Sequence, residues 1–65
     1  MNFYRSIHIQ GDEEGEEWEL FAVVPEHVTA QQVMFAPEET DIICECFTQE
    51  NADLIVDLLN SRRMH

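Results

Sequence analysis

Apolar and polar residues alternate along two stretches near the start of the chain, which predicts two β-strands. Residues 3–10 place Phe3, Ile7 and Ile9 on one face and mostly polar side chains on the other. This period of two is typical of a half-buried strand. Residues 18–24, which read WELFAVV, are apolar on both faces and end at Pro25, a residue that cannot donate to a sheet ladder. We interpret the pair as a β-hairpin joined by an acidic loop over residues 11–17.

A third strand and a helix are predicted in the C-terminal half. Residues 41–47 alternate again, and Thr48 follows them with a hydroxyl suited to capping a helix. Apolar residues then recur at helical spacing, which predicts an amphipathic helix over residues 49–62. Its apolar stripe consists of Leu54, Ile55, Leu58 and Leu59, with Ala52 beside them. Residues 26–37 fit either a short helix or turn through position 34 or an extra edge strand at 33–35, and we favour the helix.

These elements predict a single small α+β domain over residues 1–65. Its mostly antiparallel three-stranded sheet would carry the C-terminal helix across one face. The sheet residues expected beneath the helix are Ile7, Ile9, Leu20, Ala22, Ile42 and Cys44. The other face would leave more apolar surface in water than a small protein tolerates, so we expect a homodimer that buries it. The predicted dimer interface consists of Phe21, Val23, Ile43 and Phe47.

Charge adds a second feature between the first two strands. Six of the eight residues from 12 to 19 are acidic, and the whole chain has 14 acids, three arginines and no lysine, for a formal charge of −11. Such a field repels nucleic acid and anionic membranes and favours a basic protein as partner. We expect the crowded like charges to disfavour a tight turn. The candidate binding residues are Asp12, Glu13, Glu14, Glu16, Glu17, Trp18 and Glu19.

Candidate catalytic and metal chemistry is sparse. Ser6 and Ser61 have no hydrolase motif around them, and the two glycines form no phosphate-binding loop. Cys44 and Cys46 resemble half of a thiolate site, but structural zinc needs about four ligands and the three histidines are scattered. The acidic run lacks the ligand spacing of a calcium loop. We therefore expect no enzyme activity, no cofactor and no metal.

The first residues of the chain and the spacing of its two cysteines indicate the cellular compartment in which we expect the protein. No secretion signal opens the chain, and no apolar stretch approaches the roughly 18 residues of a membrane span. The two thiols, two residues apart on one strand face, are poorly placed to bond each other. We expect a cytoplasmic protein with both thiols free.

The last third of the chain resembles the C-terminal strand and helix of many short bacteriophage and prophage proteins. The resemblance rests on residues 44–47, 50–52, 54–56 and 58–60, which read CECF, ENA, LIV and LLN. It implies a small accessory protein made in a bacterial cell, and it carries over no functional residue.

Three functional hypotheses follow. The first is a non-enzymatic module that presents carboxylates to a basic host or phage protein, as a nucleic-acid mimic or inhibitor. The alternative is a homo-oligomeric structural or assembly module whose charge serves only solubility. A third hypothesis, a metal-dependent enzyme, would use Cys44, Cys46 and a histidine.

Overall fold

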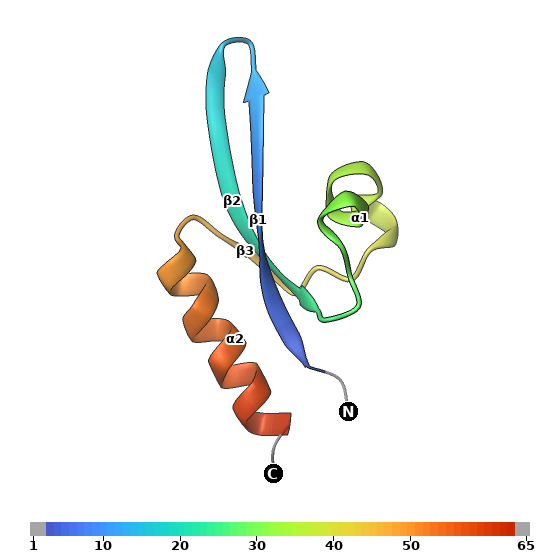
Figure 1. The fold of residues 1–65 in the computed structure, drawn as a ribbon, viewed down its shortest axis with the longest axis vertical. Coiled ribbons are helices and arrows are strands. Elements are labelled where there is room, and N and C mark those ends of the chain that lie inside the picture. Colours follow the sequence, from blue (N-terminus) through green and yellow to red (C-terminus); the bar gives the residue numbers. More distant parts are fainter. Residues whose placement is uncertain (1–2, 64–65) are drawn as a thin grey trace.

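The first two strands form one continuous hairpin with a tight turn. The computed structural model describes residues 3–63, and β1 (Tyr4–Glu13) pairs with β2 (Glu16–Pro25) along the full length of both strands (Figure 1). Between them lie Glu14 and Gly15, with φ of 54° and 84°, as a two-residue type I′ turn requires. The expectation of a loop over residues 11–17 is therefore wrong.

The hairpin forms despite the like charges that it brings together. Asp12 lies opposite Glu17, and Glu13 lies opposite Glu16. All four side chains are exposed, so water screens each repulsion to about 0.2–1 kcal/mol. A ladder hydrogen bond contributes a net of about 0.5–1.5 kcal/mol, and Gly15 adopts its positive φ without steric cost. Regular pairing therefore outweighs the repulsion.

The third strand, β3 (Cys44–Cys46), is shorter than the predicted 41–47 and pairs antiparallel with β2. The sheet order is β1-β2-β3. Segment 26–37 contains a short helix, as favoured: α1 (Ala30–Phe35) is followed by the 3₁₀ turn η1 (Pro37–Glu39). Thr29 and Gln32 form a capping box, in which the Thr29 hydroxyl accepts the Gln32 N–H at 3.2 Å. The alternative of an edge strand at 33–35 is wrong, because this cap starts a helix.

The C-terminal helix, α2 (Gln49–Arg63), packs on the sheet face opposite to the one predicted. The Thr48 hydroxyl caps it by accepting the Asn51 N–H at 3.2 Å. Its buried contacts are made by Ala52 against the sheet, with Ile55, Val56 and Leu59 partly buried around it. The sheet residues of this cluster are Phe21, Val23, Cys44 and Cys46, together with Tyr4.

Leu54 and Leu58, which were predicted to face the sheet, are each 60% exposed. The prediction placed them in the core because they stand next to Ile55 and Leu59 in a broad apolar stripe. The observed contact stripe runs instead through positions 52, 55, 56 and 59, which is also helical spacing. Ala52, fully buried, permits a close approach to the sheet and so sets which side of α2 faces inward.

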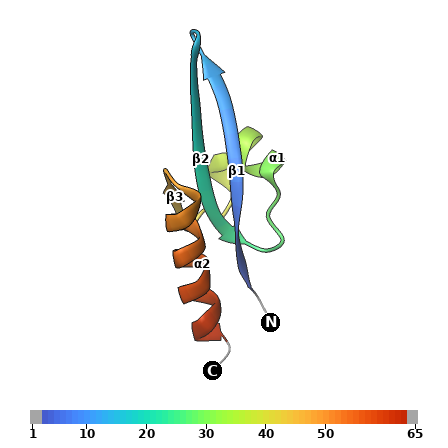
Figure 2. The same ribbon diagram turned by 60° about the vertical axis from the view of Figure 1, so that its left-hand side comes forward.

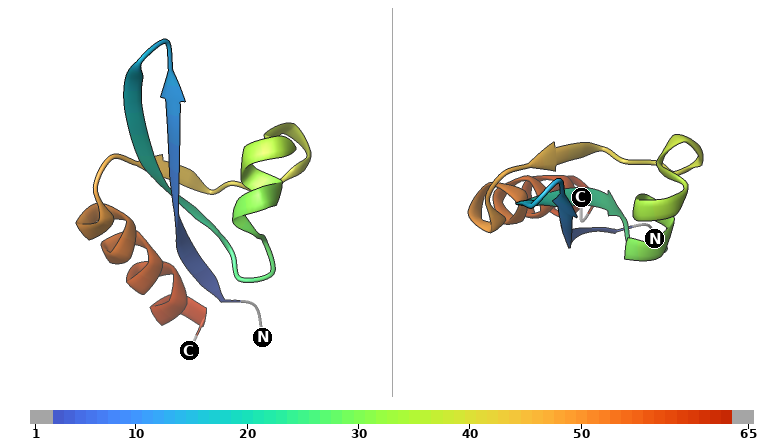
Figure 3. Two further views of the ribbon diagram at one scale, coloured as in Figure 1. Left: turned by 45° about the horizontal axis from the view of Figure 1, so that its top comes forward. Right: turned by 90° about the horizontal axis from the view of Figure 1, so that it is seen from above.

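The other sheet face is covered by α1 and the segment before it. Ile7, Ile9 and Ala22 are buried there with Val24, Val28 and Val33, and Leu20 and Ile42 pack against them. The Arg5 guanidinium donates to the Val28 carbonyl and holds this segment to β1. Figures 1 and 3 show α1 and α2 on opposite sides of the hairpin. The α+β class, the antiparallel three-stranded sheet and the C-terminal helix on one face are thus confirmed.

Candidate functional site: the acidic hairpin tip

The far half of the hairpin extends away from the rest of the protein. We call residues 12–19 the hairpin tip. It rises beyond both helices in two views related by a 60° turn (Figures 1 and 2). It thus forms one end of a molecule that is 46 Å long, 25 Å wide and 13 Å thick. β3 reaches β2 only at residues 21–23. The tip is therefore a two-stranded ribbon that the other described elements leave uncovered.

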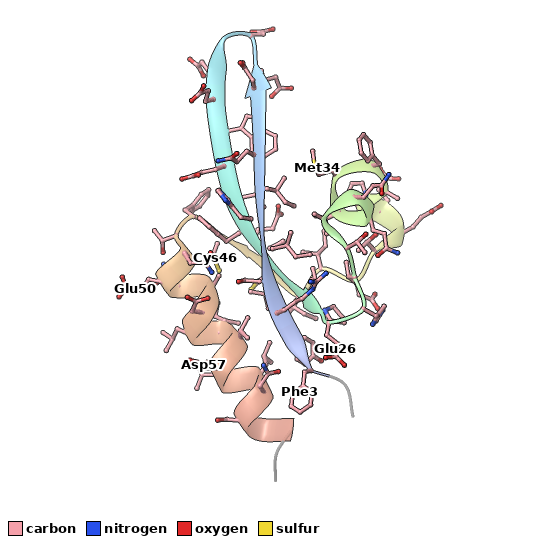
Figure 4. All side chains as sticks on the ribbon, viewed as in Figure 1. Phe3, Glu26, Met34, Cys46, Glu50 and Asp57 are labelled. Carbon is pink, nitrogen blue, oxygen red and sulfur yellow. The ribbon has the colours of Figure 1, made fainter. Side chains whose placement is uncertain are left out.

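The six acidic residues of the tip occupy both faces and the turn. Side chains alternate along each strand, and the register aligns the faces of the two strands. One face, continuous with the face that α2 covers, carries Asp12, Glu17 and Glu19. The opposite face carries Glu13 and Glu16 beside Trp18. Glu14 stands in the turn, and carboxylate oxygens surround the end of the ribbon (Figure 4).

The tip holds its charges at a density close to that of a nucleic acid. From the Gln10–Glu19 pair to the turn there are four residue steps, or about 14 Å at about 3.4 Å per residue. Six carboxylates over that length give about one charge per 2.3 Å, against about one per 1.7 Å along duplex DNA. All six carboxylates are exposed. The two-stranded ribbon therefore carries negative charge on both faces and at its end, and a basic groove that encloses it can contact all six carboxylates.

Trp18 lies across Gly11 on the opposing strand. The two residues are directly paired, and a Cβ atom added at Gly11 would lie 2.2 Å from Trp18 Cζ2. The indole thus occupies the space that a side chain at position 11 would fill, while 42% of its surface stays exposed. Sequence reasoning placed Trp18 in the site but overlooked Gly11. Gly11 could have been identified if a tight turn at Glu14 and Gly15 had been predicted, because that turn fixes the register that pairs Gly11 with Trp18.

His8 is a second residue that sequence reasoning left out of the site. Its ring stacks on Phe21 at a centroid distance of 4.6 Å, and its Nε2 lies 2.8 Å from Glu19 Oε2. Among the described residues this is the one ion pair within 4.0 Å, formed when His8 is protonated. His8 therefore anchors the base of the tip at Glu19, whereas the remaining tip carboxylates have no cation beside them in the described part of the chain.

The four residues predicted as a dimer interface are separated by the fold. Phe21 and Val23 are buried beneath α2 of the same chain, whereas Ile43 is 47% exposed and Phe47 is 87% exposed. The structure therefore does not bring them together as one surface. Exposed apolar side chains occur instead on α2, at Leu54 and Leu58, and on α1, at Met34 (Figure 4).

The cysteines and histidines of residues 3–63 do not converge on a common site. Cys44 and Cys46 are free thiols on the sheet face beneath α2, and Cys46 lies near the start of that helix (Figure 4). Within residues 3–63, no three side chains of His, Cys, Asp or Glu are grouped as a metal site would require. Of the three histidines considered as ligands, His65 lies outside the described residues.

Comparison with known proteins finds no matching family model, no similar curated protein and no similar solved structure. The fold and the site therefore define the class to which the chain can be assigned: a small α+β protein with a projecting acidic β-ribbon. In the described part of the chain, neither helix has the length and apolar character needed to span a membrane.

Proposed function

We propose that the protein is a non-enzymatic binding module whose hairpin tip presents carboxylates to a basic protein, in the manner of a nucleic-acid mimic. The observation that carries this proposal is the placement of six exposed carboxylates on one projecting ribbon, at nearly the linear charge density of DNA. A basic groove that normally holds a nucleic acid would accept such a ribbon. The resemblance of the last third of the chain to phage proteins favours a bacterial cytoplasm as the setting.

The arrangement of the tip also supports a charged partner over a purely solvating role. Solubility needs net charge but no particular placement of it. Here directly opposed acids, such as Asp12 and Glu17, repel each other across the ribbon. This repulsion raises the free energy of the unbound ribbon. A cationic partner would relieve it on binding, which makes association more favourable.

The experiment is a pull-down from bacterial lysate at low and high salt, with two variants of equal charge. The hairpin-neutral variant replaces the six tip acids with their amides. The body-neutral variant does the same at six exposed acids elsewhere: Glu26, Glu38, Glu39, Asp41, Glu45 and Asp57. Both lose six negative charges, and they differ only in where those charges were.

We expect the native protein and the body-neutral variant to capture the same basic proteins at low salt and to release them at high salt, because screening over about 8–10 Å weakens exposed charge pairs. The hairpin-neutral variant should capture none of them. Capture of nothing by the native protein, or equal capture by both variants, would contradict the proposal.

A second candidate function is a homo-oligomeric assembly module. Three exposed apolar side chains favour it: Phe47 at 87%, and Leu54 and Leu58 at 60% each. The two functions are separated by the hairpin-neutral variant, which an assembly module tolerates without loss. Light scattering at micromolar concentration tests self-association directly, and a monomer there would reject the assembly module.

A further inference from the structure

The outer edge of β2 is unpaired over the part of the strand that lies beyond β3. In β2, the Val23 carbonyl accepts the Ile43 N–H at 2.9 Å, so the backbone groups of Val23 point toward the side of β3. Residues two apart in a strand direct their backbone groups to the same side. The N–H and C=O groups of Glu17 and Glu19 therefore point to that side too, where β3 has already ended.

The pairing of β1 with β2 gives the same alternation independently. The Glu26 N–H donates to the Phe3 carbonyl at 2.8 Å, so odd-numbered residues of β1 and even-numbered residues of β2 exchange the hairpin bonds. The backbone groups of Glu17 and Glu19 take no part in that ladder. Among the described residues, no hydrogen-bond partner is found for these backbone groups. The free edge runs over residues 16–20, or about 17 Å at about 3.4 Å per residue.

An exposed strand edge is a template for another strand, and the side chains along this one select the kind of strand. Glu17 and Glu19 stand about 6.8 Å apart on one face of the edge. Trp18 lies between them on the other face, and Phe47 follows Cys46 where the free edge begins. A strand that alternates basic and apolar residues would place its cations beside the two carboxylates and its apolar side chains beside Trp18.

A second copy of this chain does not fit the edge, since its own hairpin would bring acid against acid. The corresponding edge of β1 is less suited to a cation, because on the face that carries Glu17 and Glu19 its side chains in the same rows are Asp12 and Gln10, which supply one carboxylate in place of two. Its first outward backbone groups, at Tyr4, are bonded by Asn60. Charge complementarity thus favours a basic partner at β2.

We propose that the free edge of β2, over residues 16–20, takes up an extended basic segment of a partner protein as a fourth strand of the sheet. The inference rests on the proposed function and specifies the form of the partner. Main-chain hydrogen bonds to Glu17 and Glu19 supply affinity that does not depend on charge, and the carboxylates select a basic sequence. Binding therefore combines the geometry of strand addition with electrostatic selection.

The test compares two variants at one position, Glu17→Gln and Glu17→Pro. Both remove the same charge, but only proline removes the outward N–H. Since that N–H lies on the free side of the strand, Glu17→Pro loses no hairpin bond. The probe is a peptide of about six residues that alternates arginine and valine, and its binding is followed by the emission of Trp18, the single tryptophan.

We expect Glu17→Pro to bind the peptide at least tenfold more weakly than Glu17→Gln. Two versions of the peptide, N-methylated at one or the other alternate set of amides, have the same charge and keep the test decisive if Glu17→Pro does not fold. Binding should be lost with one set and retained with the other. On native protein, hydrogen exchange at the Glu17 and Glu19 amides should slow when the peptide is bound.

Equal affinity of Glu17→Pro and Glu17→Gln, or equal binding of both N-methylated peptides, would overturn strand addition. If the binding is nevertheless weakened by salt, the proposed function stands and the inference alone fails. If neither this peptide nor poly-arginine binds at low salt and the lysate yields no partner, the proposed function fails with it.

Discussion

The side-chain amide of Asn60 in α2 bonds both backbone groups of Tyr4 at the start of β1. Its Oδ1 accepts the Tyr4 N–H at 2.8 Å, and its Nδ2 donates to the Tyr4 carbonyl at 3.1 Å. The Tyr4 groups point away from β2, so the amide takes the place of one residue of a neighbouring strand. This contact fastens the C-terminal end of α2 to the outer edge of the sheet.

Replacing Asn60 with Ala should therefore destabilise the fold. The partly buried N–H and C=O of Tyr4 would lose their partners, at a cost of about 1–3 kcal/mol. Asn51→Ala is the matched control, because Asn51 is an exposed residue of the same helix. Urea unfolding followed by circular dichroism should show a clear loss for Asn60→Ala and a small change for Asn51→Ala. Equal effects would indicate that the amide contributes nothing beyond helix propensity.

Because Trp18 packs on Gly11, the effect of Gly11→Ala on the free energy of unfolding should change sign when Trp18 is removed. With Trp18 present, Gly11→Ala forces the indole aside, which should cost about 1–3 kcal/mol and shift the emission of Trp18 to longer wavelength. With Trp18 replaced by Ala, the same Gly11→Ala change should stabilise the strand by about 0.5–1 kcal/mol, since glycine is unfavourable within a strand. A double-mutant cycle measures the difference. Additive effects would show that the indole does not occupy this space.

The pair of Asp12 and Glu17 makes the ribbon sensitive to salt. Glu17→Lys would place opposite charges across the strands and should raise the free energy of unfolding by about 0.2–1 kcal/mol at low salt. The gain should shrink as salt is added. Glu45→Lys changes the charge equally on a strand but lies opposite Ala22, so its effect should be smaller. Thermal unfolding of both variants at two salt concentrations provides the comparison, and equal stabilisation by both would contradict a local effect.

The thiol of Cys44 should make the fold sensitive to alkali. Partial burial raises its pKa above the ordinary value of 9.0, and the neighbouring Cys46 raises it further. The folded state thus keeps this proton to higher pH than the unfolded state. The associated stability is complete below pH 9 and is lost as the pH rises through the folded pKa. The urea midpoint should fall as the pH is raised above 9, and it should fall less in Cys44→Ala. An identical fall in both would contradict the shift.

The pattern of hydrophobic residues predicted the fold class, because the fold class is determined mainly by which apolar side chains must be buried. Ile7 and Ile9 alternate with polar neighbours, and Thr48 caps the helix where the sequence places it. The side of the sheet that α2 covers was not predictable in this way. Phe21 and Ala22 are adjacent, apolar and both buried, so the alternation leaves either face available, and the choice depends on packing between distant segments.

The candidate site was predicted in composition but not in shape. The acids of residues 12–19 are evident in the sequence, and the structure brings them together on one ribbon. Their repulsion was weighed too heavily against the turn at Glu14 and Gly15, whose backbone geometry favours a hairpin. The contacts of Gly11 and His8 depend on the register across the two strands, which a tight turn sets and a loop would not.

The central claim is that the placement of the six tip carboxylates, rather than net charge, carries binding. The most direct measurement is the dissociation constant of the purified complex with the captured basic partner, obtained by calorimetry over a range of salt concentrations. The native protein and the body-neutral variant should both lose affinity steeply as salt rises, whereas the hairpin-neutral variant should bind weakly at every salt concentration. A hairpin-neutral variant with native affinity and native salt dependence would contradict the account.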